Sequence, residues 1–171
     1  PPAGLAARAG LHGTCSRGLS PTVVPPAAVG GVDGLIDEFA GIAKGILMLG
    51  ERPLASMDRA VAIGERLSAL LMAAYLESQN TLAVAVNAAQ VIATDDVFSN
   101  ASPLMEETRT RAANVIKPLL DQGVTPVVTG FNAATLDGRP TTPRRGGPGL
   151  SAASHATPGD AAELGLWTVV G

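Results

Sequence analysis

The 171-residue chain is long enough for one folded domain, and 46% of its residues are hydrophobic, which is enough for a core. Its net charge of −3, without any long run of lysine or arginine, argues against nucleic acid binding. Charged residues or glycine interrupt every apolar stretch well before the roughly 20 residues that a membrane span needs, so we expect no membrane association. Aromatic residues make up only 3% of the chain, which favours an α/β fold over an aromatic-rich β-sandwich.

Cysteine and histidine are scarce in the sequence. The single cysteine, Cys15, cannot form an internal disulfide, and no group of cysteines and histidines has the spacing of a metal site. The first thirty residues also lack the apolar block of a signal peptide. We therefore expect a cytoplasmic protein without a metal site built from its own side chains.

Residues 1–30 contain many prolines and glycines and no acidic residue, so we predict a mostly irregular segment there. Residues 22–24, which read TVV, are the only candidate for a short strand within it. From residue 31 onward the pattern becomes that of a folded domain. We therefore divide the chain into an irregular segment, 1–30, and a domain, 31–171.

Helical spacing of apolar residues predicts three helices in this domain. The first starts at Gly34, and the second follows Pro53, with Ser56 as the N-cap, and runs to about Glu77. The third starts at Ser102, has an acidic first turn, is kinked by Pro118 and stops at Gly123.

Short apolar, β-branched stretches predict buried strands at residues 81–86, 124–129 and 164–170. The Asp137-Gly138 pair predicts a small hairpin over residues 131–143 that projects from the sheet. The alternation of strands and helices predicts a mainly parallel sheet in a three-layer α/β/α sandwich.

Three segments are more polar or richer in glycine than packing requires. Glu65 and Arg66 lie side by side on the second helix, either as a surface ion pair or as functional groups. Residues 126–131, PVVTGF, end a strand at the edge where open α/β sheets bind ligands, although a simple strand exit gives the same pattern. Residues 141–147, TTPRRGG, fit an anion-binding loop or an unstructured basic loop.

Asp95 and Asp96 raise a separate question. Two adjacent carboxylates can hold a metal, but Thr94-Asp95-Asp96 is also typical of a turn in which aspartate side chains accept hydrogen bonds from the backbone. We favour the turn.

Taken together, and in this order, these stretches resemble the catalytic domain of the aspartate kinase family, a branch of the amino acid kinase superfamily. The matching stretches are GERLSALLMAAYLES (64–78), VIATDDVFSNA (91–101), PVVTGF (126–131), DGRPTT (137–142), RGG (145–147), SAA (151–153) and LWTVVG (166–171). The resemblance implies an amino acid kinase fold and ATP-dependent phosphorylation of L-aspartate to 4-phospho-L-aspartate, the entry step to lysine, threonine and methionine synthesis. It also implies ATP and Mg²⁺ as cofactors and is compatible with a homo-oligomer.

By position, the resemblance implies that Glu65, Phe131 and Arg145 bind the aspartate substrate. Arg145 corresponds to the arginine that binds a substrate carboxylate, which suits the bidentate fork of a guanidinium. The resemblance assigns Gly146, Gly147 and Thr168 to nucleotide binding.

The sequence departs from the family pattern at groups that carry charge. The family's opening K-F-G-G-T-S reads LHGTCS at residues 11–16, without the lysine. In the glycine loop, Pro148 and Gly149 replace a serine and an aspartate, and residues 167–171, WTVVG, lack both acids of the family's W-T-D-V-D-G. The resemblance is thus to a truncated, partly degenerate catalytic domain without regulatory ACT domains, and no catalytic residue is assigned. The alternative to a kinase is a non-catalytic remnant or fragment that at most binds aspartate or nucleotide.

Overall fold

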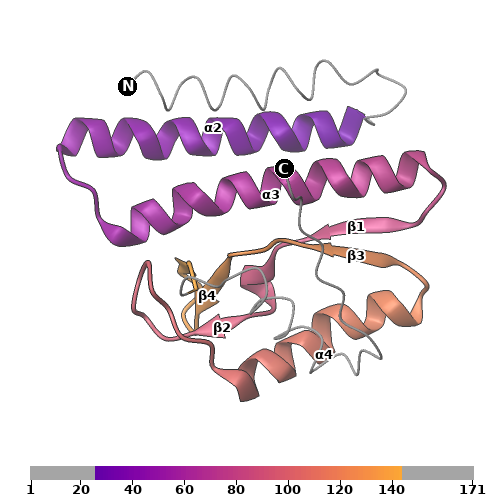
Figure 1. The fold of residues 1–171 in the computed structure, drawn as a ribbon. Helices are drawn as coiled ribbons and strands as arrows, with labels where there is room; N and C mark the ends of the chain where they lie inside the picture. The colour runs from indigo at the N-terminus through magenta and orange to yellow at the C-terminus, as the bar shows by residue number, and fades with distance from the viewer. Residues whose placement is uncertain (1–25, 144–171) are drawn as a thin grey trace, which may run out of the picture.

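The computed structural model describes residues 26–143. The predicted strands at residues 22–24 and 164–170 lie outside this range. The described helices are α2 (Pro26–Leu49), α3 (Leu54–Ser78), the short 3₁₀ helix η1 (Ala88–Gln90) and α4 (Met105–Asp121), and Figure 1 shows their arrangement. The strands are β1 (Ala83–Val86), β2 (Ala93–Thr94), β3 (Thr125–Val128), β4 (Ala133–Thr135) and β5 (Pro140–Thr141).

The strands form two small sheets. In the first, β1 pairs in parallel with β3, with Ala83 opposite Thr125 and Val86 opposite Val128, so the predicted parallel pair is confirmed. In the second, β2 is parallel to β4 and β4 is antiparallel to β5. The hairpin predicted from Asp137-Gly138 is thus confirmed as β4 and β5, with Gly138 at a φ of 84° in its turn. It belongs to a three-stranded sheet that β2 completes.

Helices cover the parallel strand pair from both sides. In Figure 1, α3 lies between α2 and the strands β1 and β3, while α4 lies on the far side of the strands. Helix α3 contacts both β1 and β3, and α4 contacts β3 and β2. This arrangement confirms an α/β fold with parallel strands.

Hydrophobic clusters hold the helices in place. Between α2 and α3 the buried residues are Val32, Leu35, Ile63 and Leu67. Between α4 and the strands they are Val86, Val91, Ala112 and Ile116. Gly31 lets α2 approach α3 closely, because a methyl group at this position would lie 2.9 Å from Cδ2 of Leu70.

Helix α2 begins much earlier than the sequence predicted. It starts at Pro26, so the helix start predicted at Gly34 was wrong. Glycines weaken a helix considered in isolation, and three of them at positions 30, 31 and 34 masked the pattern. Packing against α3 stabilises the segment instead: Val32 is buried at 1% exposure within the α2–α3 cluster.

The two predicted serine caps were also wrong. Helix α3 starts at Leu54 after Pro53, whose φ of −58° already suits a helix, and Ser56 lies inside the first turn. Helix α4 starts at Met105, after its N-cap Leu104. The backbone N–H of Ser102 donates to Asp95 Oδ1 at 3.0 Å, so Ser102 belongs to the preceding loop.

Helices α2 and α3 are joined by charged groups as well as by apolar contacts. Glu38 of α2 accepts hydrogen bonds from Arg59 Nε at 3.0 Å and from Arg66 Nη1 at 2.9 Å, both on α3. Partial burial opposes ionisation of Glu38, but these hydrogen bonds and the two positive charges outweigh it and hold its pKa below the ordinary 4.5.

Replacing Glu38 by glutamine should therefore lower stability only modestly, by about 0.2–1 kcal/mol at pH 7, because the arginines are partly exposed to solvent. Since the folded-state pKa is lowered, the stabilisation is present above about pH 4.5 and disappears as the pH falls through the folded-state value. Urea unfolding of both proteins at pH 7 and at pH 3 measures this. A loss that stays the same at pH 3 would contradict the ion-pair explanation.

None of the helices in residues 26–143 is long and apolar enough to cross a membrane.

Candidate functional site

The carboxyl ends of β1 and β3 meet beside helix α3. Because the two strands are parallel, Asn87, which follows β1, and Thr129, which follows β3, come to the same edge. Open α/β sheets bind ligands at this edge. A cavity of about 240 Å³ lies there, lined by parts of α2, α3, β1 and the end of β3, including Gly31, Arg66, Asn87 and Thr129.

Glu65 of α3 lies beside Gly130, which follows the end of β3 by two residues. The carboxylate accepts a hydrogen bond from the backbone of Gly130. The approach is close, since a Cβ added to Gly130 would lie 3.4 Å from Glu65 Oε2. Burial raises the pKa of Glu65 above the ordinary 4.5, and the hydrogen bond with Gly130 offsets part of that rise. The helix thus carries a half-buried carboxylate to the carboxyl end of β3.

Phe131 follows Gly130 in an unusual backbone conformation. Its φ is 47°, in the left-handed region that a bulky residue rarely occupies. The residue is half-buried, and Asn132 next to it is buried at 1% exposure, so packing holds the turn in place. The structure therefore places one predicted substrate residue, Glu65, beside Gly130, the residue that precedes another, Phe131.

A polar network at the same edge was not predicted from the sequence. Asn87 Oδ1 accepts hydrogen bonds from Asn132 Nδ2 at 2.6 Å and from the Ala89 N–H at 3.0 Å. Thr129 Oγ1 accepts from the Ala88 N–H at 2.8 Å. The network ties the loop after β1 to the turn after β3. Asparagine and threonine are common in loops, so the sequence alone gave no reason to single these residues out.

One member of this network has an unused acceptor. Asn132 Oδ1 is buried and has no hydrogen-bond partner among the described residues. A buried polar atom without a partner carries a cost of about 1–3 kcal/mol.

Arg66 does not pair with its neighbour Glu65. Its guanidinium binds Glu38 of α2, so the hypothesis of a Glu65–Arg66 surface ion pair was wrong. The Glu65 carboxylate interacts with the backbone of Gly130 instead.

The turn at Asp95 is confirmed. Its Oδ1 accepts hydrogen bonds from the backbone N–H groups of Val97 at 3.3 Å and Ser102 at 3.0 Å, as a turn aspartate does. Within residues 26–143, no group of three or more His, Cys, Asp or Glu side chains is placed to hold a metal ion.

Four predicted site residues lie outside the described residues: Arg145, Gly146, Gly147 and Thr168. The described chain ends just before them. Strand β5 ends at Thr141, and the buried Thr142 and Pro143 follow it.

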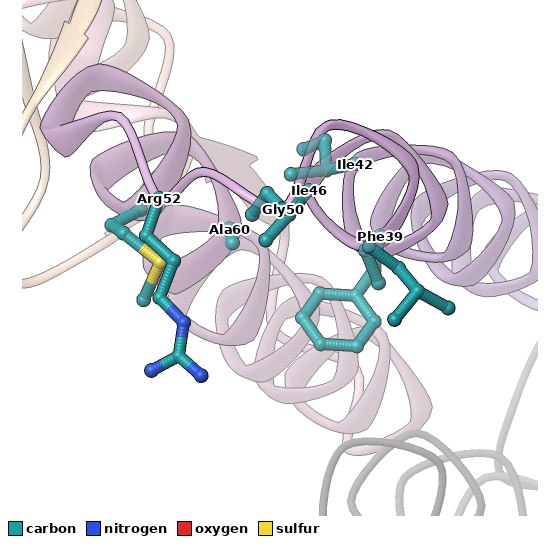
Figure 2. Close-up of a pocket in the computed structure, with 9 residues that line it drawn as sticks. Phe39, Ile42, Ile46, Gly50, Arg52 and Ala60 are labelled. Atoms are coloured by element: carbon teal, nitrogen blue, oxygen red, sulfur yellow. The ribbon is translucent and has the colours of Figure 1, made fainter. Parts of the chain in front are cut away.

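A larger cavity, of about 360 Å³, lies between α2 and α3 away from the strand ends. Figure 2 shows Phe39, Ile42 and Ile46 around it, with the Arg52 guanidinium extending away from them. Since its lining is almost wholly apolar, this cavity does not suit a charged amino acid.

The sequence pattern of the Amino acid kinase family matches residues 16–171. The chain belongs to this family. Within it, the relatives found are aspartokinases. The chain is 31% identical over 140 residues to the aspartokinase of Chlamydia muridarum, covering 82% of this chain and 31% of the relative.

Solved structures show the same likeness. Aspartokinase III of Escherichia coli in complex with lysine and aspartate matches with a TM-score of 0.79 and 27% identity, over 85% of this chain and 32% of that chain. The same enzyme in complex with aspartate and ADP matches with a TM-score of 0.75 and 27% identity, over 81% and 30%. The chain thus spans about a third of the length of these relatives.

Proposed function

We propose that this chain supplies the aspartate-binding part of an aspartokinase, which transfers the γ-phosphoryl group of ATP to the side-chain carboxylate of L-aspartate. The products are ADP and 4-phospho-L-aspartate. The observation that carries the proposal is the placement of Glu65 against Gly130 and next to Phe131, at the carboxyl end of β3. A similar enzyme, aspartokinase III of Escherichia coli, has been solved with aspartate and ADP.

Aspartate recognition requires groups of both charges. The ammonium group of the substrate needs an anion, and Glu65, above its pKa, provides one in a partly desolvated position. Each carboxylate needs a cation, and the fork of Arg145 matches a carboxylate with two parallel hydrogen bonds. We assign Phe131 to an apolar wall of the same pocket. This set of side chains accounts for the ammonium group and for one carboxylate of aspartate.

Phosphoryl transfer depends mainly on positioning and on neutralising negative charge. We assign Gly146, Gly147 and Thr168 to the nucleotide, because glycines let backbone N–H groups approach phosphate oxygens. Magnesium would accompany ATP, held chiefly by phosphate oxygens and water, as is usual for this ion in kinases.

A second candidate function is binding without catalysis. Residues 11–16 lack the lysine of the family pattern, and Pro148 and Gly149 replace its serine and aspartate. Removing one preorganised charge-stabilising group commonly costs about 100-fold or more in rate. The chain alone is therefore expected to bind aspartate and to turn it over slowly or not at all.

Two measurements test the proposal. Calorimetric titration of L-aspartate into the chain should give binding, and succinate, which lacks the amino group, should bind more weakly. A coupled assay of ADP release, with magnesium ATP and with or without aspartate, measures turnover. Aspartate-dependent release at about 1–100 per second, the usual range for kinases, would show that other residues replace the missing groups. Absence of aspartate binding in the titration would reject the proposed function and would leave only nucleotide binding for the second candidate.

A further inference from the structure

Helix α3 carries a second carboxylate, Asp58, that neither the sequence motifs nor the proposed substrate contacts use. Asp58 lies seven residues before Glu65, so the two side chains lie on the same face of the helix, about two turns apart. Asp58 is buried at 2% exposure. A buried carboxylate is costly unless hydrogen bonds satisfy it, so its partners show what it does.

Asp58 accepts four hydrogen bonds from two distant residues. Its Oδ2 accepts from the backbone N–H of Ser99 at 2.6 Å and of Thr142 at 3.1 Å. Its Oδ1 accepts from Ser99 Oγ at 2.8 Å and from Thr142 Oγ1 at 2.7 Å. One carboxylate thus joins α3 to the loop before α4 and to the end of the β4–β5 hairpin.

These two segments also hold each other. The N–H of Ala101 donates to the carbonyl oxygen of Thr142 at 3.1 Å, and Ala101 pairs with Pro143 in an isolated parallel bridge. Ser99 has a φ of 64°, an uncommon conformation for a residue other than glycine, and its N–H and Oγ both reach the same carboxylate. Both segments therefore direct hydrogen-bond donors at the Asp58 carboxylate.

We propose that Asp58 is a positioning residue that fixes the backbone of Thr142, and through it the start of the segment that carries Arg145, to the helix that carries Glu65. Arg145 follows Thr142 by three residues in the sequence. Because Asp58 and Glu65 lie on one face of α3, the helix links Thr142 to the Gly130 turn. The inference rests on the proposed function, in which Glu65 and Arg145 bind one aspartate molecule.

The test measures hydrogen exchange at single amides by NMR. In Asp58→Asn, the amides of Ser99 and Thr142 should exchange about tenfold to 100-fold faster, the effect expected for hydrogen bonds to a charged acceptor. The amide of Thr129, which donates to the carbonyl oxygen of Val86, reports global opening and should change little. Glu77→Gln, the same charge change at an exposed position of α3, is the matched control and should leave all three amides unchanged.

A second pair of variants keeps the test informative if Asp58→Asn folds poorly. Thr142→Val keeps the shape of the side chain but removes the hydroxyl donor, whereas Thr142→Ser keeps the donor. Exchange at Ser99 and residue 142 should rise in the valine variant and stay near the wild-type rate in the serine variant. A role in stability alone predicts equal acceleration at Thr129, and that result, or unchanged exchange at Ser99 and Thr142, would overturn the proposal.

Aspartate titration separates this inference from the proposed function. If the wild type binds aspartate, Asp58→Asn should weaken binding about tenfold, the loss expected when one hydrogen-bonded charge contact is misplaced, while Glu77→Gln keeps full affinity. Full affinity in a folded Asp58→Asn protein would overturn the positioning role. If the wild type binds no aspartate, the proposed function fails, and the exchange rates still decide whether Asp58 holds Thr142 in place.

Discussion

Replacing Arg145 by alanine is expected to reduce the affinity of the chain for L-aspartate at least about 100-fold, to below detection in a calorimetric titration. In the proposed function the guanidinium donates two parallel hydrogen bonds to one carboxylate, and each hydrogen bond to a charged group contributes about 1.5–3 kcal/mol. Since 1.4 kcal/mol corresponds to a factor of ten, the loss of both exceeds two orders of magnitude.

Arg144 provides a matched control for this change. It lies next to Arg145 and has the same charge, so either alanine variant changes the net charge of −3 by the same amount. The family pattern has a glycine at this position, so we expect Arg144→Ala to bind aspartate as well as the wild type or better. Equal losses in the two variants would point to general electrostatic attraction.

Arg145→Lys refines the comparison. Lysine keeps the charge but lacks the planar fork, so this variant should recover only part of the affinity that alanine loses. If Arg145→Ala binds aspartate as tightly as the wild type, the correspondence with the family at this loop is wrong.

The parallel strand pair could be predicted from the sequence because its signal is local. Residues 81–86 and 124–129 are short apolar stretches rich in β-branched residues, and the structure pairs them as β1 and β3. Asp137-Gly138 likewise marks its hairpin, since the turn needs a residue with positive φ and Gly138 supplies it. Where a few neighbouring residues determine the structure, the local sequence pattern was enough to predict it.

Features that depend on distant contacts were missed. Strand β2 has only two residues, Ala93 and Thr94, and it exists because it pairs with β4 about forty residues later. The first part of α2 is helical through packing on α3, against its own glycines. Ser102 had the local pattern of a helix cap, but the Asp95 side chain binds its N–H.

The candidate site divides in the same way. Resemblance to a family singled out Glu65 and Phe131 as candidates, because their motifs are continuous stretches of sequence. Asp58 belongs to no such stretch: its partners Ser99 and Thr142 lie 41 and 84 residues away, so only the folded chain reveals the cluster. Asn87 and Asn132, separated by 45 residues, were missed for the same reason.

The second large effect is expected at Glu65, where glutamine should raise stability at pH 7 and lower aspartate affinity. Burial raises the pKa of Glu65 above 4.5, so the folded chain binds this proton more tightly than the unfolded chain. Stability therefore falls as the pH rises from about 4.5 through the folded-state pKa, and the cost of the ionised form is fully present above that value. Glutamine removes that cost and can still accept the hydrogen bond from Gly130.

The same substitution removes the anion that we assign to the ammonium group of aspartate. Losing a contact between charged groups corresponds to about 1.5–3 kcal/mol, or roughly a tenfold to 100-fold loss of affinity. Succinate has no ammonium group, so its affinity should not fall. Glu77→Gln, at an exposed position of the same helix, should change neither stability nor binding.

Urea unfolding at pH 4 and pH 7, together with titrations of aspartate and succinate at pH 7, measures both effects. The stability gain of Glu65→Gln should be largest at pH 7 and should shrink toward zero below about pH 4.5, where both the folded and the unfolded wild type carry the proton. A gain of the same size at pH 4 would mean that charge is not its cause. An equal loss of aspartate and succinate affinity would show that Glu65 does not act on the ammonium group and would contradict that assignment.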